Sequence, residues 1–202
     1  MKITQGFRVK TKTLAFVIVF AALTVAINIA GPKIPAPYAP FLLYQFWEIP
    51  IVFAFLALGF VAGLTIAVIN TLVLLVYAPG PIPFGPFYNL FALLAMVLGV
   101  YIPYLISTRG YKKENLMSYL RQHATLIVIS ATALGIIFRV AVTSFTNYFL
   151  MQQPAPLGLS YPPQAALAFL PLSVLFNSTV ALYTVPIAIG ITLAVIAMIK
   201  LK

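Results

Sequence analysis

Long apolar runs dominate the chain, and short proline- and glycine-rich stretches separate them. A helix that spans a membrane needs about 20 consecutive, mostly apolar residues. Runs of this kind cover 14–30, 86–107, 124–151 and 165–199. The run 49–77 is long enough for one tilted span or for two short ones. The pattern predicts an all-α integral membrane protein with five or six helices in one compact bundle.

The distribution of basic residues distinguishes five crossings from six. Lysine and arginine are enriched in the cytoplasmic loops and tails of membrane proteins. Here they gather before residue 13, between 109 and 121, and at the C-terminus. Six crossings place all three groups on one side, whereas five separate the middle group from the N-terminus. We therefore expect one domain over 1–202, both termini cytoplasmic, and helices at 13–30, 46–59, 62–78, 86–108, 123–150 and 166–199.

Glycine and proline mark the expected connections. With six crossings, the tight turn between the second and third helices falls at 59–63, where glycine lets the chain turn. Gly59 and Gly63 also form a GxxxG pattern, which lets helices pack closely. The segments 31–45, 79–85 and 151–165 would share the opposite side. Their prolines predict stiff loops, poor in regular hydrogen bonds, that form a rigid rim around an outward-opening cavity.

Composition supports a membrane protein and limits its chemistry. The chain is 63% hydrophobic and 7% charged, against about 25% charged residues in soluble domains. The net charge of +10 invites a nucleic-acid partner, but its placement follows membrane topology and suits contact with anionic lipid instead. The absence of cysteine excludes disulfides, thiol catalysis and thiolate metal sites.

The familiar sequence signatures of catalysis are missing. The chain contains no P-loop, no HExxH and no GxSxG motif, and its single histidine has no partner that suggests a metal site. We therefore expect no metal site, and a protein that carries its ligand without covalent change needs no catalytic residue. If the protein takes part in ATP-driven transport, the ATPase must be a partner.

One arginine lies near the middle of the fifth expected helix. A charge there is costly, so Arg139 needs a partner, a wet cavity or a ligand. Thr143 and Asn147 follow it at i+4 and i+8 on the same helix face, with Tyr148 beside them. Glu48 is the one acid at membrane level that could pair with Arg139. A functional pocket is the favoured interpretation, and a purely structural ion pair is the alternative.

Amide and aromatic side chains could complete such a pocket. Asn89 and Asn177 lie within apolar runs, and Tyr44 and Trp47 lie at the start of the second helix. Together with Tyr148 they would suit a flat aromatic ligand with polar edges. Buried asparagines can instead join helices, and aromatics can instead form the interfacial belt.

The first helix carries a strip of small residues. Ala22, Ala26 and Ala30 recur every four positions, which lets another helix approach closely in lipid. Its partner is either internal or a second protein, and composition slightly favours internal packing.

Several short motifs in series resemble one family. They are 40–42 (Pro-Phe-Leu), 46–50 (Phe-Trp-Glu-Ile-Pro), 58–63 (Leu-Gly-Phe-Val-Ala-Gly), Asn147 with Tyr148, and Phe176 with Asn177. In order and spacing this series resembles the S components, the substrate-binding membrane subunits, of energy-coupling factor (ECF) vitamin transporters. The riboflavin-specific group is the most similar.

The resemblance implies a six-helix, non-enzymatic subunit of a prokaryotic plasma membrane that captures a vitamin beneath its first loop. Loaded S components are thought to topple against a transmembrane coupling protein driven by two ATPase subunits. Ala22 and Ala26 match the family's docking motif. No cofactor is implied, and riboflavin is the expected transported ligand. The expected binding residues are Tyr44, Gln45, Trp47, Glu48, Asn89, Arg139, Thr143, Asn147, Tyr148 and Asn177.

Three departures leave the ligand open. Gln45 replaces an acid of the riboflavin group, Val180 replaces a lysine, and Phe60 replaces a proline. Another vitamin or precursor is therefore the first alternative, with Arg139 as a candidate for the missing cationic donor. A membrane enzyme acting on lipid or isoprenoid, or a structural subunit, is an alternative of a different class.

Overall fold

The computed structural model describes residues 11–77, 82–108 and 122–200. These residues form six helices and one two-stranded hairpin. In chain order the elements are α1 (Thr11–Ala30), β1 (Ile34–Ala36), β2 (Ala39–Tyr44), α2 (Glu48–Leu58), α3 (Phe60–Tyr77), α4 (Gly85–Thr108), α6 (Ala124–Leu150) and α7 (Pro163–Lys200). The expected helices are all present, and the largest difference in a boundary is the start of α7 at Pro163 rather than 166.

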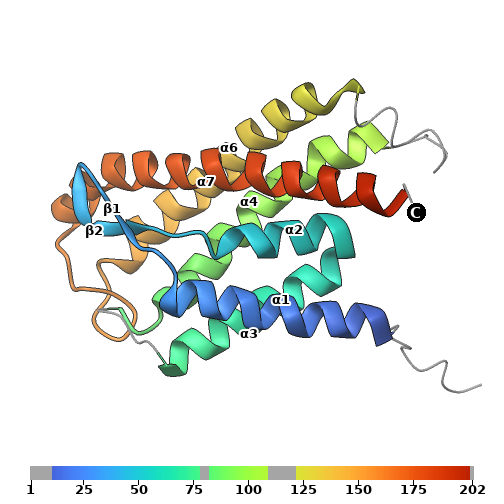
Figure 1. The fold of residues 1–202 in the computed structure, drawn as a ribbon. Helices are drawn as coiled ribbons and strands as arrows, with labels where there is room; N and C mark the ends of the chain where they lie inside the picture. The colour runs from blue at the N-terminus through green and yellow to red at the C-terminus, as the bar shows by residue number, and fades with distance from the viewer. Residues whose placement is uncertain (1–10, 78–81, 109–121, 201–202) are drawn as a thin grey trace, which may run out of the picture.

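The helices run alternately between two ends of an elongated bundle (Figure 1). The hairpin and the segment 151–162 lie at one end, which we call the hairpin end. The start of α1 and the last described turn of α7 both lie at the other end (Figure 1). Five of the described helices are long and apolar enough to cross a membrane. The sixth, α2, has 11 residues and is only about 16 Å long.

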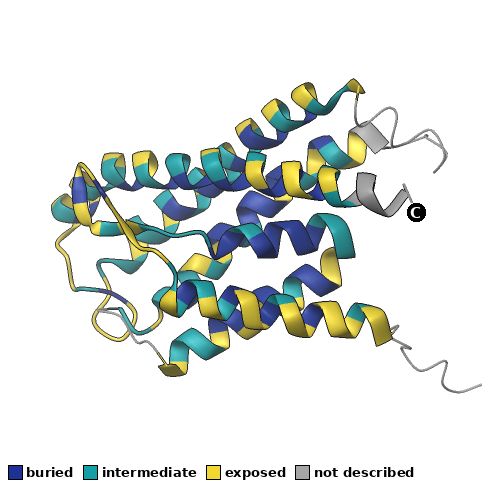
Figure 2. Ribbon diagram, viewed as in Figure 1, coloured by how far each residue is buried: buried dark blue, intermediate teal, exposed yellow. Residues whose placement is uncertain are grey.

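The short helix α2 lies in the interior of the bundle. It contacts α1 and α3 on one side and α7 on the other, while α4, α6 and α7 pack together as a second group. Seven of its residues are buried, from Glu48 to Phe55, and Figure 2 shows this concentration of buried positions. Most of α2 is therefore buried against its neighbours, and only its last turn, 56–58, is partly exposed.

The turn between α2 and α3 is a single residue. Gly59 adopts φ 100° and ψ 170°, a conformation that side chains with a Cβ rarely adopt, and α3 begins at the next residue. Gly63 lies against the ring of Phe55, which a Cβ at that position would overlap. Both predicted roles of this glycine pair, turn and close packing, are confirmed.

A glycine also sets the closeness of α4 and α6. A Cβ on Gly99 would collide with the backbone carbonyl of Leu134, so the two helices cross in backbone contact. One turn away, the Arg139 guanidinium reaches the sulfur of Met96 at 3.7 Å. This crossing brings the mid-helix arginine of α6 into the interior of the bundle.

The first loop is more ordered than its prolines predicted. β1 and β2 pair antiparallel, and Pro37 and Tyr38 form the turn between the paired residues Ala36 and Ala39. A two-stranded sheet consists of edge strands, which tolerate proline. The expectation of a loop poor in regular hydrogen bonds is therefore wrong here, although the described chain is mostly helical.

The hairpin pairing is irregular in a way that shapes the bundle end. The register shifts between Pro35 and Ala36, whose partners are Leu43 and Ala39. Residues 40–42 of β2 therefore bulge out of the ladder. At the turn, burial and the hydrogen bond to Tyr44 raise the pKa of Tyr38 to about 12, so its phenol stays neutral at physiological pH.

The connection between α6 and α7 also makes backbone hydrogen bonds. The amides of Leu159 and Tyr161 both donate to the carbonyl of Met151, at 3.2 and 3.0 Å. The hydroxyl of Tyr88 on α4 donates to Leu157 at 2.6 Å. This segment thus folds back on the bundle and forms part of the wall at the hairpin end.

Candidate ligand cavity

Three adjoining hollows open beneath the hairpin, and all three are lined by Leu42 and Asn89. The α1 lobe, of about 750 Å³, reaches Asn28 and Lys33. The hairpin lobe, of about 390 Å³, lies over Glu48 and Arg139 and is also lined by Phe176, Val180 and Tyr183. The α6 lobe, of about 170 Å³, is lined by Arg139, Thr143, Thr146, Asn147, Ser173, Phe176 and Asn177. We treat them as one cavity because they share lining residues.

The predicted pairing of Glu48 with Arg139 is confirmed. The two guanidinium NH groups donate to the two carboxylate oxygens, at 2.6 and 2.9 Å. Both residues are only 3% exposed. Glu48 begins α2, where the positive end of the helix dipole also favours a carboxylate. The pair forms part of the wall of the hairpin lobe.

A polar network extends from this pair along α6 and α7. The Nε of Arg139 donates to the side-chain oxygen of Asn177 at 2.9 Å, and the Asn177 amide donates to the Ser173 carbonyl at 3.0 Å. The Asn147 amide donates to the Ser173 hydroxyl at 2.6 Å. The network joins α2, α6 and α7, so it orients the polar groups of the cavity before any ligand arrives.

The face of α6 predicted from i, i+4, i+8 spacing is confirmed. Arg139, Thr143 and Asn147 all line the α6 lobe. The Thr143 hydroxyl donates a hydrogen bond to the Arg139 carbonyl at 2.9 Å. A threonine inside a helix commonly bonds to the carbonyl four residues earlier in this way. Tyr148, the next residue after Asn147, points about 100° further round the helix. It contacts Phe149 and is absent from the linings of all three lobes.

The aromatic residues divide between cavity wall and support. Trp47 lines the α1 and hairpin lobes and is 8% exposed. Tyr44 lines none of the three lobes; it stacks on Phe176 with ring centroids 5.0 Å apart, and Phe176 lines two lobes. Tyr44 therefore holds the hairpin against α7 and supports the Phe176 ring, which faces the cavity.

Gln45 and Asn89 both line the cavity. Gln45 lines two lobes, and its backbone carbonyl accepts a hydrogen bond from Tyr183 of α7 at 2.6 Å. Asn89 is exposed and lines all three lobes. Both side chains offer a donor and an acceptor to a ligand.

Sequence reasoning missed several lining residues. The hairpin bulge places Phe41 and Leu42 at the cavity, where Phe41 approaches Phe169 of α7. Asn28 also lines the α1 lobe, and its amide donates to Asn70 of α3 at 3.4 Å. An asparagine in an apolar helix was the available signal for Asn28, whereas no local pattern predicted the bulge.

The alanine strip of α1 faces away from the bundle. Ala22 and Ala26 are exposed, while Val17, Ala21 and Thr24 form the buried side of the helix. The slight preference for internal packing of this strip is therefore wrong. Its exposed position leaves it open to lipid or to a partner helix.

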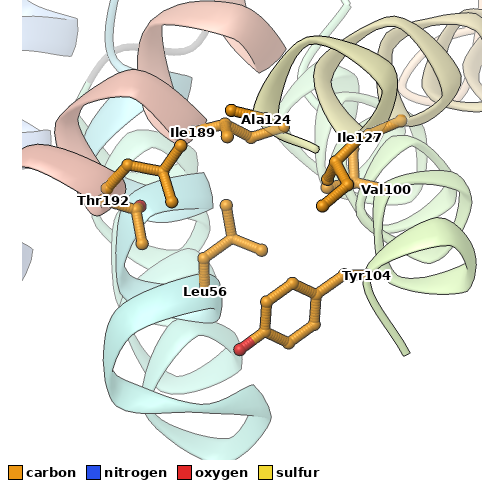
Figure 3. A pocket seen from close by; sticks show the side chains of 9 residues that line it. Leu56, Val100, Tyr104, Ala124, Ile127, Ile189 and Thr192 are labelled. Atoms are coloured by element: carbon orange, nitrogen blue, oxygen red, sulfur yellow. The ribbon is translucent and has the colours of Figure 1, made fainter. Parts of the chain in front are cut away.

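A further hollow lies beside the start of α6, away from the hairpin end, and Figure 3 shows the side chains that line it. It measures about 30 Å³ and is lined mainly by apolar side chains, among them Leu56, Val100 and Ile127. That volume holds little more than one water molecule. Within the described residues, no cluster of three or more His, Cys, Asp or Glu side chains could hold a metal ion.

The comparisons with known proteins support the fold. No protein-family model and no curated protein matches the sequence. A solved structure of the S component of a bacterial ECF transporter is similar, with a TM-score of 0.69. The alignment covers 95% of this chain and 99% of that chain at 20% sequence identity. At this identity the likeness concerns the fold alone: the chain folds like that S component.

Proposed function

We propose that this protein is the substrate-binding membrane subunit of an ECF-type importer, and that it binds riboflavin or a related flavin. The observation that carries the proposal is the cavity beneath the hairpin, which combines Trp47 and Phe176 with a fixed row of amides and hydroxyls. Ligand pockets are mostly apolar with a few placed polar groups. The similar fold of a known S component supports the same function.

The proposed topology has six crossings, with both termini on the cytoplasmic side of a prokaryotic plasma membrane. The alternating helices support it, and so does the position of the start of α1 and the end of α7 at the same end of the bundle (Figure 1). The basic residues before residue 13 support the same orientation. The hairpin end then faces outward, where a scarce vitamin would be captured.

Delivery requires partners in this proposal. The protein binds its ligand without changing it, and a transmembrane coupling protein with two ATPase subunits supplies the energy. The exposed face of Ala22 and Ala26 would contact the coupling protein closely, because alanine allows two helix backbones to approach.

A second vitamin or precursor is the alternative ligand. Val180 is buried and lines the hairpin lobe, at the position where the riboflavin group carries a lysine. Gln45 likewise offers an amide where that group carries an acid. These two side chains change the hydrogen bonds available to the edge of the ligand.

An absorbance and emission spectrum of the purified protein, before and after riboflavin is added, tests the ligand. We expect bound flavin in one-to-one ratio with protein and with quenched emission, because aromatic rings line the cavity. A matched pair of variants, Asn89→Ala in the cavity and Thr65→Ala on the exposed side of α3, should separate lost binding from general damage. Failure to bind riboflavin at micromolar concentration would reject the flavin and leave other vitamins to be screened.

A further inference from the structure

The charges around the cavity are few and unequally placed. Among the described residues that line the three lobes, the charged side chains are Glu48, Arg139 and Lys33. Glu48 and Arg139 neutralise each other through two short hydrogen bonds. Lys33 is exposed and lines only the α1 lobe. The buried part of the cavity therefore carries no uncompensated charge.

The remaining polar groups of the lining are neutral. They are side-chain amides and hydroxyls, which accept and donate hydrogen bonds but cannot balance a formal charge. The members are Asn28, Gln45, Tyr77, Tyr88, Asn89, Thr143, Thr146, Asn147, Tyr161, Ser173, Asn177 and Tyr183. Such a lining suits a ligand rich in carbonyl, imide or hydroxyl groups.

A charged ligand would disturb the existing pair. An anion or a cation in the hairpin lobe would lie near both members of the pair, so attraction to one member is offset by repulsion from the other. Either would have to give up its hydration or compete for a partner already held at hydrogen-bond distance, and an unpaired buried charge is strongly unfavourable. Lys33 compensates little, because water and salt screen an exposed charge within about 8–10 Å.

We propose, building on the transport function above, that the closed Glu48–Arg139 pair makes the site selective for electrically neutral ligands. Phosphorylated or carboxylated forms of the same molecule are then excluded by charge rather than by size. For flavins, this means riboflavin is taken in preference to flavin mononucleotide. The pair determines specificity because its net charge is zero, so it cannot balance a charge on the ligand.

Matched neutral and charged ligands test the proposal on the unmodified protein. Suitable pairs are riboflavin with flavin mononucleotide, pyridoxine with pyridoxine 5′-phosphate, pantothenol with pantothenate, and biotinamide with biotin. Binding is followed by calorimetry in detergent. Whichever pair binds, we expect the neutral member to bind at least about tenfold more tightly. Equal or tighter binding of the charged member would overturn the proposal.

Variants of the pair give a second, independent test. Glu48→Gln leaves the guanidinium without its counter-charge, so the preference for the neutral ligand over the anion should shrink by at least about tenfold. In Glu48→Gln with Arg139→Gln the preference should return, because the wall is again uncharged. Lys12→Gln, at an exposed lysine at the start of α1 that lines no lobe, is the control and should leave the preference unchanged. If Lys33→Gln alters the preference and the double variant does not restore it, then the exposed lysine of the α1 lobe sets the selectivity and the proposal fails.

The outcomes also separate this inference from the proposed function. Binding of a neutral vitamin other than riboflavin supports charge selection and rejects only the flavin. Binding of a charged vitamin in preference to its neutral partner rejects charge selection but keeps the transport function. If no ligand of the series binds to a protein that remains folded by its melting curve, both are rejected.

Discussion

Glu48 and Arg139 are 91 positions apart in the chain, yet their side chains form a two-point ion pair in the interior of the bundle. The pair joins the start of α2 to the middle of α6. Asn177 of α7 holds the same guanidinium from the other side at 2.9 Å. One arginine thus fixes three helices around the cavity floor.

Removing one partner of this pair should be costly for stability. Arg139→Met leaves the Glu48 carboxylate buried without a partner, and we expect a loss of about 3–5 kcal/mol. The melting temperature of the purified protein in detergent measures the effect. Arg139→Met combined with Glu48→Gln should recover part of the loss. A single variant as stable as the unmodified protein would show that the pair is not closed in the membrane.

The turn at Gly59 should not tolerate a side chain. Gly59→Ala forces a Cβ into φ 100°, so we expect a loss of about 1–3 kcal/mol. Gly190→Ala is the matched control, because α7 is helical there and no atom lies within 4 Å of the added Cβ. That change should be neutral or raise stability by up to about 1 kcal/mol. Equal effects of the two variants would contradict the strained turn.

Two aromatic residues near the same end of the bundle should differ in ligand binding. Phe176→Ala removes a ring from the cavity wall and also the surface on which Tyr44 stacks. We expect its dissociation constant for the ligand to rise at least about tenfold. Tyr148→Ala should leave the constant within about twofold, because that side chain lines no lobe. Calorimetric titration distinguishes them, and the reverse order would contradict the cavity assignment.

Larger residues on the exposed face of α1 should prevent assembly without affecting the ligand. Ala22→Leu and Ala26→Leu hold a partner helix further away, so co-purification with the coupling protein should fall severalfold while the dissociation constant stays unchanged. Ile18→Leu, an exposed change of equal volume on the same helix, should have no effect. If Ala22→Leu and Ala26→Leu assemble normally with the coupling protein, the docking surface lies elsewhere.

The helix positions could be predicted because they follow from the local pattern of apolar residues. The ion pair could be predicted because the chain has so few acidic residues. Apolar runs have the length of a membrane span, and a chain with one membrane-level acid offers Arg139 few partners. The hairpin could not be predicted in this way, because Pro35 and Pro40 argue locally against a strand. Its stability depends on distant contacts such as that between Tyr183 and the Gln45 carbonyl.

The same reasoning explains the errors in the site. Helix periodicity correctly grouped Arg139 with Thr143 and Asn147, because neighbours at four-residue spacing share a face. Tyr148 was included for its chemistry although its angle on the helix directs it elsewhere. Leu42 was not expected, because its position depends on a register shift that only the folded hairpin creates.

Fluorescence of Trp47 tests the central claim most directly. It is the only tryptophan of the chain, and it lines the α1 and hairpin lobes. Riboflavin added to the purified protein should quench its emission to saturation at one ligand per protein, and Phe176→Ala should shift the titration to higher concentration. Emission that stays constant while riboflavin binds by calorimetry would place the ligand outside the cavity beneath the hairpin and contradict the account.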